Sequence, residues 1–478
     1  MISCPLLTSA AARGGLIIFF AAILSVAAGQ HSTGTDLSRK PNIVFILADD
    51  LGYYDLSCYG NPYNNTPHID YLANRGMKFT NAYAASPVCS PSRAAILTGR
   101  HPARLKLTNF LVGDKIDSSS AVLPAAWKPE LSGDEVTLAE LLKHEGYATG
   151  VIGKWHLGWS DSSKASSQGF MYDRIIGRNG LDYYNYSITA DNKEIFADDG
   201  DEYLTDKLTD YADEFLDSNH EKPFFLFMSY SAPHVLLVPR ADKLRKYLFA
   251  YNQADNKYNP YYAAMLESMD DGVGRILNKL KSLGVDDNTI VIFTSDNGGV
   301  GLPELGPTPT SMKPLRAWKG HVYEGGIRVP LIVKWPGKIP AGTTNANYLT
   351  GTDYLPTFME ILGKKVNHTI DGKSFLNSLY NPGQVFDRGP VFWHYPHFSN
   401  QEGRPAGAMR WKNFKLVENY ETGQLSLYNL ENDPGETQDL AGTLSETKND
   451  FNTIFNRWKK EVGANMPVPN PAYRKPSR

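Results

Sequence analysis

The stretch Ile43-Val44-Phe45-Ile46-Leu47-Ala48-Asp49-Asp50 is a continuous apolar run that ends in two acidic residues. A run of this length, rich in β-branched and aromatic residues, is typical of a strand buried on both faces of a parallel sheet. Three later runs have the same character and also lead into polar residues: Thr149-Gly150-Val151-Ile152, Phe224-Phe225-Leu226-Phe227-Met228 and Ile290-Val291-Ile292-Phe293. The four runs predict four strands of one sheet.

Helical patterns lie between these runs. Thr137–His144 places leucines on one face and stops at Gly146, and Tyr261–Leu283 repeats apolar residues at three- and four-residue steps before Gly284. Buried strands that alternate with helices predict an α/β fold, in which helices sandwich a large, mostly parallel sheet. Because ligands bind at the carboxyl ends of such strands, the polar residues that follow the runs are expected to converge on one site.

A smaller unit is expected after this sheet, with a catalytic domain at residues 41–365 and a C-terminal subdomain at residues 366–478. The segments Val391–Tyr395, Phe414–Val417 and Leu425–Tyr428 have the pattern of short strands between turns. A helical pattern at Asp450–Val462 follows them. The subdomain is therefore predicted to be α+β, built on a short antiparallel sheet.

The composition limits the classes of protein to which the chain can belong. It has 478 residues, with 48 Lys and Arg against 51 Asp and Glu, 42% hydrophobic residues and 3 cysteines. A disulfide scaffold, a disordered or collagen-like chain and an electrostatic binder of nucleic acid each need a very different composition. We therefore expect a large globular protein that binds no nucleic acid.

Residues 1–29 have the layout of a secretory signal peptide, and residues 30–40 form a polar linker. A head that contains Arg13 precedes the apolar stretch Leu16–Leu24, and the small residues of Ser25–Gly29 follow. The apolar stretch falls short of the roughly 20 residues that a membrane-spanning helix needs. The expectation is an exported protein, periplasmic or extracellular, with no membrane span after signal cleavage.

The acidic ends of two runs supply only oxygen ligands. Asp49 and Asp50 follow the first run, and Asp296 and Asn297 follow the last. Such oxygens suit Ca²⁺, or Mg²⁺ where the cavity is small. The ordinary alternative is that these residues cap helices or form turns, as most Asp-Asp and Asp-Asn pairs do.

A second feature is the stretch Cys89-Ser90-Pro91-Ser92-Arg93, which continues to Leu97-Thr98-Gly99-Arg100. Pro91 and Ser92 indicate the start of a helix, which would put Cys89 at the positive end of the helix dipole, where an anion could sit. A small buried thiol is the more common role of an isolated cysteine, and this is the interpretation for Cys58.

The pattern C-x-P-S-R followed by L-T-G-R resembles the signature of the type I, formylglycine-dependent sulfatases of the alkaline-phosphatase-like superfamily. Other segments resemble this family in the family's order, over about residues 41–465, and they are Pro41–Gly52, Thr66–Asp70, Gly153–Gly158, Ala232–His234, Ser295–Gly299, Lys319–Pro330 and Tyr428–Pro434. The resemblance implies hydrolysis of sulfate monoesters to sulfate and an alcohol.

The resemblance also implies a modified residue and a metal. A maturation enzyme would oxidise Cys89 to formylglycine, and one hydroxyl of the hydrated aldehyde would attack sulfur. Asp49, Asp50, Asp296 and Asn297, together with residue 89, would bind Ca²⁺. Asp296 would also assist deprotonation of the attacking hydroxyl.

Five further residues receive roles from the resemblance. Arg93 would hold and polarise the diol, while Lys154 and Lys319 would neutralise the sulfate. His234 would protonate the leaving oxygen, and His156 would accept a proton from the second hydroxyl. A metal and two lysines would stabilise the charge of the transition state, and an imidazole would spare the departure of a bare alkoxide.

Two segments, Ala103–Thr108 and Trp393–His397, resemble the subgroup that acts on carbohydrate sulfates, so a sulfated oligosaccharide or polysaccharide is the expected substrate. His394, His397 and Arg178 are candidates for contacts with it, although the two histidines fit a strand edge equally well. Trp318 departs from the small residues common before the second lysine, and it either shapes the substrate pocket or packs.

Three alternatives share parts of this pattern. A phosphonate or phosphate monoester hydrolase of the same superfamily would use the same metal and nucleophile, but its more highly charged substrate would favour additional cations. A catalytically silent protein that binds sulfated glycans would be free to lose the nucleophile. A cysteine hydrolase would need partners for a thiolate at Cys89.

Overall fold

The computed structural model describes residues 40–111, 119–177, 182–191, 193–197, 202–250, 258–303 and 308–474. The expected signal peptide, the linker up to residue 39, and Arg178 lie outside the described residues. From Lys40 onward the chain forms one compact unit. Among the described residues, no helix combines the length and the apolar character needed to cross a membrane.

The four predicted strands are confirmed, and they are direct neighbours in one sheet. They are β9 (Thr289–Ser295), β1 (Asn42–Ala48), β8 (Phe224–Ser229) and β4 (Ala148–Gly153). All three neighbouring pairs are parallel, so the four carboxyl ends meet at one edge of the sheet. This order explains why residues far apart in the sequence form one site.

The complete sheet has ten strands in the order β11-β2-β10-β9-β1-β8-β4-β5-β6-β7. The parallel centre predicted from the sequence is confirmed, and it extends to β5. Antiparallel pairings join β10 to both its neighbours and connect β5, β6 and β7 at one edge. These outer strands are β2 (Met77–Tyr83), β5 (Tyr172–Ile176), β6 (Ser187–Ala190), β7 (Lys193–Phe196), β10 (Leu331–Lys334) and β11 (Thr343–Thr350).

Helices cover both faces of the sheet. Val44 and Ile46 of β1 pack in a core with α1 (Pro67–Arg75), α5 (Leu204–Asn219) and α7 (Pro260–Ser282). Phe45 and its neighbours of the same parity pack on the opposite face with α2 (Cys89–Thr98), α4 (Leu138–His144) and α9 (Tyr354–Ile361). Successive side chains of β1 thus point alternately into two cores, as expected for a sheet that is buried on both faces.

The helix predictions are confirmed with small shifts of their ends. The pattern at Thr137–His144 is α4, which Thr137 and Glu140 begin with a reciprocal capping box. The pattern at Tyr261–Leu283 is α7, capped by the Asn259 side chain. Shorter helices complete the chain, and they are α3 (Pro102–Leu105), α6 (Ala241–Ala250), α8 (Glu324–Ile327), α10 (Leu376–Tyr380) and the 3₁₀ turns Ser57–Tyr59, Ala165–Gln168, Asp286–Asn288 and Gly351–Asp353.

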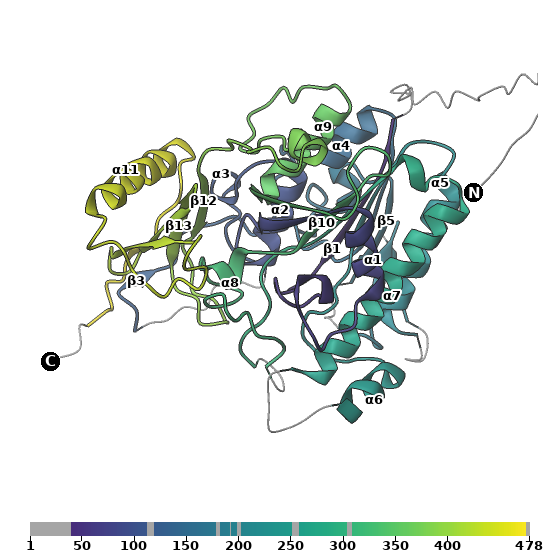
Figure 1. Cartoon of the computed structure of the whole chain (residues 1–478), viewed down its shortest axis with the longest axis horizontal. Helices are drawn as coiled ribbons and strands as arrows, with labels where there is room; N and C mark the ends of the chain where they lie inside the picture. Colours follow the sequence, from purple (N-terminus) through teal and green to yellow (C-terminus); the bar gives the residue numbers. More distant parts are fainter. Residues whose placement is uncertain are drawn as a thin grey trace, which may run out of the picture. The chain divides into compact units, whose positions relative to one another are not determined.

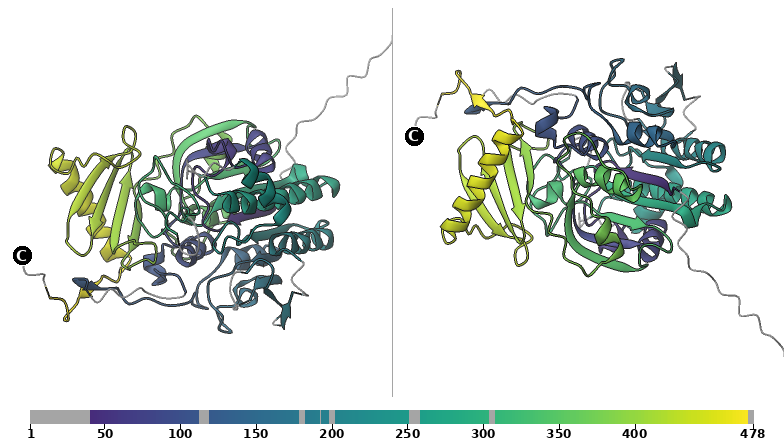
Figure 2. Two further views of the ribbon diagram at one scale, coloured as in Figure 1. Left: turned by 90° about the horizontal axis from the view of Figure 1, so that it is seen from below. Right: turned by 90° about the horizontal axis from the view of Figure 1, so that it is seen from above.

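A separate four-stranded antiparallel sheet forms the C-terminal part, as predicted (Figure 1). Its strands are β12 (Val391–Tyr395), β13 (Ala406–Trp411), β14 (Phe414–Asn419) and β15 (Leu425–Asn429). The helix α11 (Ser445–Glu461) packs Phe451, Phe455 and Trp458 on one face of this sheet. Figure 2 shows the sheet and α11 standing beside the large sheet, and β3 (Val122–Leu123) pairs with β16 (Val468–Pro469).

A buried ion cluster joins the two sheets, and we call it the joint cluster. The ammonium of Lys415 on β14 lies 2.9 Å from Glu324 Oε1 and 2.9 Å from Glu436 Oε1, and all three side chains are 0% exposed. Glu324 Oε2 accepts a hydrogen bond from the Tyr83 hydroxyl at 2.7 Å, and Glu436 Oε2 accepts one from the Glu324 amide at 2.7 Å. The carboxylate oxygens of the joint cluster are thus paired mainly with other members of the cluster.

Candidate active site

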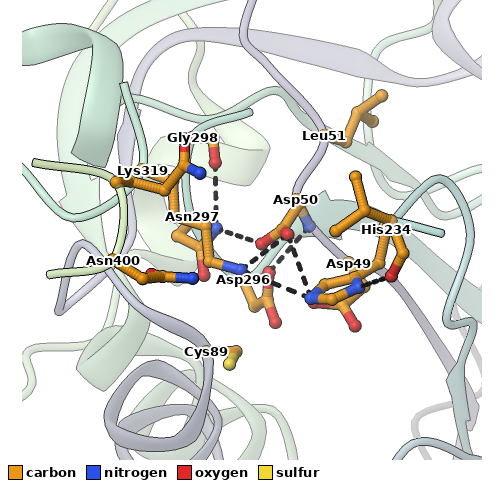
Figure 3. A network of polar contacts seen from close by, with 12 residues as sticks. Asp49, Asp50, Leu51, Cys89, His234, Asp296, Asn297, Gly298, Lys319 and Asn400 are labelled. Carbon is orange, nitrogen blue, oxygen red and sulfur yellow. Dashed lines mark hydrogen bonds and ion pairs between the residues drawn. The ribbon is translucent and has the colours of Figure 1, made fainter. Parts of the chain in front are cut away.

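The carboxyl ends of the four central strands carry the residues expected from the sequence. Asp49 and Asp50 follow β1, Lys154 and His156 follow β4, His234 lies beyond β8, and Asp296 and Asn297 follow β9. Figure 3 shows Asp49, Asp50, His234, Asp296 and Asn297 gathered together, with Cys89 and Lys319 facing the same space. The structure therefore brings the candidate residues into one site.

The acidic group is buried and has unused oxygen atoms. Asp49, Asp296 and Asn297 are 0% exposed, and Asp50 is 1% exposed. Among the described residues, Asp49 Oδ1 and Asn297 Oδ1 have no hydrogen-bond partner. A buried polar oxygen without a partner is costly, and a hard cation satisfies several such oxygens together. These residues therefore fit a Ca²⁺ or Mg²⁺ ion.

Potential ligand atoms also lie at suitable separations. Atoms of Asp49, Cys89 and Asp296 lie within 4.8 Å of one another, as do atoms of Asp49, Asp50 and His234. The side-chain nitrogen of Asn297 donates to Asp50 Oδ1 at 2.7 Å. The side-chain oxygen of Asn297 therefore points away from Asp50. Residue 89 can thus share an ion with the carboxylates of two strand ends.

Three cations balance the carboxylates, and the six side chains together are called the site cluster: Asp49, Asp50, Asp296, Arg93, Lys154 and Lys319. Lys154 Nζ lies 2.5 Å from Asp49 Oδ2, and Lys319 Nζ lies 2.6 Å from Asp50 Oδ2. Arg93 Nη2 lies 2.8 Å from Asp296 Oδ2. Each of the two lysines is therefore held by one carboxylate.

The charges of this cluster shift its acids in opposite directions. Burial alone would raise the pKa of Asp49, but Lys154 and the other nearby cations hold it well below its usual range. Burial, and next the negative charge of Asp49, raise the pKa of Asp296 to about 7. A divalent cation between the two carboxylates would remove this repulsion.

Both lysines remain charged despite their burial. Burial would lower their pKa values, but Asp49 raises that of Lys154 and Asp50 raises that of Lys319 above the ordinary value. Two buried ammonium groups beside a nucleophile make a site for an anion with more than one oxygen atom.

Cys89 is the first residue of α2 and is 2% exposed, which confirms the predicted helix start. Its sulfur lies 3.1 Å from Nδ1 of His156. Burial raises the pKa of the Cys89 thiol, and burial together with Lys154 lowers the pKa of His156 well below its ordinary value. The unmodified pair is therefore neutral, unlike the thiolate and imidazolium of a cysteine hydrolase.

His234 lies on the other side of the carboxylates. Its Nε2 atom is 3.3 Å from Asp50 Oδ2 and 3.4 Å from Lys319 Nζ, while its Nδ1 atom contacts the carbonyl of Val235. Burial lowers the pKa of His234, and Asp50 opposes this effect. The ring presents Nε2 to the site, because Nδ1 is used by the backbone.

Unusual backbone geometry occurs at the site. Asp50 and His156 have φ values of 62° and 57°, in the left-handed region that non-glycine residues seldom adopt. Gly153, with φ of 103°, precedes Lys154, and a Cβ atom there would lie 1.9 Å from the Ser229 carbonyl oxygen. Glycine thus lets the end of β4 approach β8 closely, and the Lys154 amide donates to that carbonyl at 2.8 Å.

Two supporting residues were missed in the sequence. Ser229 Oγ accepts from Arg93 Nη1 at 2.5 Å and also donates to the Lys154 carbonyl at 2.7 Å. Ser229 ends β8, so the strand-end rule could have found it. Asp55 accepts from the Gly52 amide at 2.8 Å and from the Tyr262 hydroxyl at 2.6 Å, and so holds the loop that carries Asp49. Its sequence neighbourhood contains no signal for this role.

The weaker candidates lie elsewhere. His394 is buried in β12, where its Nδ1 pairs with the Tyr420 hydroxyl at 2.8 Å and its Nε2 with the Asn465 carbonyl at 2.9 Å, so its ring nitrogens serve the C-terminal sheet. His397 is also buried, with Nε2 at 2.8 Å from Thr108 Oγ1. Cys58 and Cys89 are both free thiols, Cys58 half-buried and Cys89 buried.

Trp318 is half-buried and packs against Gly301. Its ring covers Gly301, where a Cβ atom would lie 2.4 Å from the indole, and its Nε1 donates to the Gln401 carbonyl at 2.9 Å. The ring thus connects the segment that carries Lys319 to the loop between β12 and β13.

Comparison with known proteins decides the family. A profile described as Sulfatase matches residues 41–364, which is more than half of the chain. The chain belongs to the sulfatase family. A second profile, described as N-sulphoglucosamine sulphohydrolase, C-terminal, matches residues 317–462 of this sulfatase.

Individual relatives agree with this assignment. A protein named Sulfatase from Formosa agariphila is 32% identical and covers 91% of this chain and 90% of its own length. N-acetylgalactosamine-6-sulfatase of Rattus norvegicus is 33% identical, with 74% of this chain and 68% of its own length covered. The crystal structure of Ps i-CgsB in complex with k-i-k-neocarrahexaose has a TM-score of 0.75 and 29% identity, over 91% of this chain and 95% of that one.

These similarities confirm the resemblance found in the sequence and the alkaline-phosphatase-like fold. The protein is a sulfuric ester hydrolase. A cysteine hydrolase does not share this support.

Proposed function

We propose that this sulfatase removes sulfate from sulfated carbohydrates, with formylglycine at position 89 as nucleophile and Ca²⁺ as the bound metal. The observation that carries the mechanism is the set of buried oxygens without hydrogen-bond partners beside Cys89 at the start of α2. The carbohydrate substrate is supported by the name of the rat relative, an N-acetylgalactosamine-6-sulfatase, and by the neocarrahexaose complex of Ps i-CgsB.

The metal would be held by Asp49, Asp50, Asp296, Asn297 and residue 89. Ca²⁺ fits better than Mg²⁺ because many carboxylate and amide oxygens converge, and Ca²⁺ accepts six to eight oxygen ligands. Bound there, the ion would supply Lewis-acid stabilisation of the negative charge on a sulfate oxygen.

At residue 89 the Cys89 sulfur stands where an oxygen of the hydrated aldehyde would lie. Hydrated formylglycine would supply two hydroxyl groups, one of which would attack the sulfur atom of the sulfate ester while the bond from that atom to the alcohol oxygen breaks. His156 Nδ1, at 3.1 Å from the Cys89 sulfur, is in position to accept a proton from the other hydroxyl. The guanidinium of Arg93 is buried, and it donates to Asp296 and to the Lys154 carbonyl. In this position it would hold and polarise the diol of residue 89. Asp296 can assist removal of the proton from the attacking hydroxyl.

The sulfate would lie between the two lysines. Lys154 and Lys319 form ion pairs with Asp49 and Asp50. A bound cation would neutralise these carboxylates and so weaken the ion pairs, and the two ammonium groups would then be able to contact sulfate oxygens. His234 Nε2 lies beside Lys319, where the protonated ring can give a proton to the departing alcohol oxygen. Proton transfer by a positioned group is worth about 10²- to 10⁴-fold in rate.

We also propose that the protein is exported, to the periplasm or the extracellular space, and that a formylglycine-generating enzyme acts on Cys89 before it is buried. The motif around Cys89 becomes part of α2, so a folded chain offers little access to the thiol. N-terminal sequencing of protein recovered from natively expressing cells would test export, and an intact residue 1 would contradict signal cleavage.

The test of the mechanism is peptide mass spectrometry across residue 89, combined with sulfate release from 4-methylumbelliferyl sulfate with and without EGTA. Formylglycine at position 89, activity lost on chelation, and activity lost in Cys89→Ala are expected. Cys58→Ala, which changes the other free cysteine of the described chain, should remain active. An unmodified thiol with turnover that resists the chelator would overturn the proposal.

A further inference from the structure

The loop between β12 and β13 contains a tight turn at residues 399–403. The Ser399 amide donates to the Gly403 carbonyl at 2.8 Å, and the Glu402 amide donates to the Ser399 carbonyl at 3.1 Å. Ser399 Oγ also accepts from the Gln401 amide at 3.1 Å. These bonds define the shape of the turn, although it belongs to the C-terminal part of the chain.

This turn is docked against the two loops that carry site residues. Gln401 accepts from the Trp318 indole through its carbonyl at 2.9 Å and from the Leu302 amide through its side chain at 3.2 Å. A Cβ atom on Gly403 would lie 1.8 Å from the carbonyl oxygen of Gly320, the residue that follows Lys319. The contact is backbone against backbone, so the position of the turn relative to Lys319 is closely defined.

Asn400 is an exposed residue of this turn, whereas Ser399 and Gln401 on either side are only 2% and 1% exposed. Figure 3 shows its amide pointing toward Asp296 and Asn297, on the Lys319 side of the cluster and across from His234. Its Oδ1 atom accepts from Ser399 Oγ at 3.4 Å, so the turn helps to orient this short side chain.

We infer that Asn400 is a specificity-determining residue, which hydrogen-bonds a hydroxyl group of the sugar that carries the sulfate. The inference rests on the proposed function. Lys154 and Lys319 already supply charge for the sulfate oxygens, and an uncharged amide that both donates and accepts is matched to a hydroxyl. An aryl sulfate has no hydroxyl for Asn400 to recognise.

The test compares kcat/KM of Asn400→Ala for two substrates. One is 4-methylumbelliferyl sulfate, and the other is the sulfated sugar that the wild type cleaves best from a panel of N-acetylgalactosamine 6-sulfate and sulfated carrageenan oligosaccharides. Loss of one hydrogen bond predicts about a tenfold decrease for the sugar and less than about a twofold change for the aryl sulfate. Because a merely structural defect lowers both activities, the ratio between substrates is the decisive readout.

Two further variants sharpen the test. Glu402→Gln changes an exposed side chain of the same turn and should keep the wild-type ratio. Asn400→Asp keeps the size but brings a negative charge close to the sulfate, so it should decrease both activities. An unchanged ratio in Asn400→Ala would overturn the inference while the sulfatase proposal stands. A wild type without activity on any sulfate ester would overturn the proposed function, and the inference with it.

Discussion

Two clusters of buried charge in this protein each combine carboxylates with cations, and they differ in how closely the carboxylate oxygens are paired. In the joint cluster, Lys415 contacts both glutamates at 2.9 Å, so Glu436 Oε1, which has no hydrogen-bond partner among the described residues, still has a close ion pair. Tyr83 and the Glu324 amide donate to the other carboxylate oxygens. In the site cluster, Asp49 Oδ1 has only Arg93 Nη2 at 3.6 Å, and the backbone at Asp50 is in the left-handed region.

The difference separates a structural role from a catalytic one. A buried ion cluster whose members satisfy each other has no capacity for a ligand, and its removal affects the fold. A cluster with unused oxygens and strained backbone is stable only because the surrounding sheet holds it, and it can bind a further charge. The four predictions below test this contrast, beginning with the largest effect.

The largest effect is expected from Asp49→Asn. The variant loses a carboxylate next to residue 89 and Lys154, so activity should fall about 10³-fold or more, the range seen when a charge-stabilising group is removed. Sulfate release measures this effect, and thermal unfolding with and without Ca²⁺ should show weaker stabilisation by the ion. The matched control is Glu436→Gln in the joint cluster, whose folded fraction should retain activity. A loss of activity there equal to that of Asp49→Asn would contradict the contrast.

The opposite pattern is expected from Lys415→Met. Without the ammonium, Glu436 loses its ion-pair partner and Glu324 keeps only the more distant Arg328, at 3.6 Å, so the free energy of unfolding should fall by about 3–5 kcal/mol. The folded enzyme should keep its kcat. Urea unfolding measures the effect, and Lys412→Met, on an exposed lysine in the turn between β13 and β14, should change stability by less than about 0.5 kcal/mol. Equal stability of the two variants would show that the joint cluster does not hold the sheets together.

A smaller effect is expected from Asp55→Asn, because Asp55 acts on the site through the loop that carries Asp49 and Asp50. The amide has the size of the carboxyl but disturbs the bonds from Gly52 and Tyr262, so Ca²⁺ affinity should weaken about 10- to 100-fold. Calorimetric titration with Ca²⁺ measures this change. Asp134→Asn on an exposed turn is the control, and unchanged affinity in Asp55→Asn would reduce Asp55 to a packing role.

The last effect is one of pH and concerns the acid stability of the C-terminal sheet and its contacts. Burial lowers the pKa of His101 to about 4 and that of His394 to about 3, from an ordinary value of 6.5. His101 Nδ1 accepts from the Ala103 amide at 3.1 Å, so protonation would break that bond.

The sign of this effect follows from which state binds the proton. Between pH 6.5 and about 4 the unfolded chain binds protons that the folded chain excludes, so stability should decrease as pH falls, by up to about 1.4 kcal/mol per pH unit for each histidine. Urea unfolding at several pH values tests this. His394→Gln should flatten the dependence, whereas His144→Gln, on a side chain that is 88% exposed, should leave it unchanged.

Much of the fold was predictable because its signals are local. The runs that became β1, β4, β8 and β9 are apolar enough to be recognised without knowledge of their partners, and the start of α2 was visible in Pro91 and Ser92. The strands β10 and β13 were not recognised. The Ala406–Trp411 segment is rich in small residues, and its strand character comes from pairing with β12 and β14.

The sequence alone determined which residue types stand at the ends of the central strands, because apolar runs, capping residues and the motif around Cys89 each act over a few positions. Only the tertiary structure decided that Asp49 Oδ1 lacks a hydrogen-bond partner among the described residues, that Asp55 supports the loop of Asp49 and Asp50, that Trp318 packs and His394 is structural, and that Asn400 points toward the site from the loop between β12 and β13. These properties depend on contacts between residues from about 70 to more than 200 positions apart, or on the direction of one side chain, and neither is encoded in a short stretch of sequence.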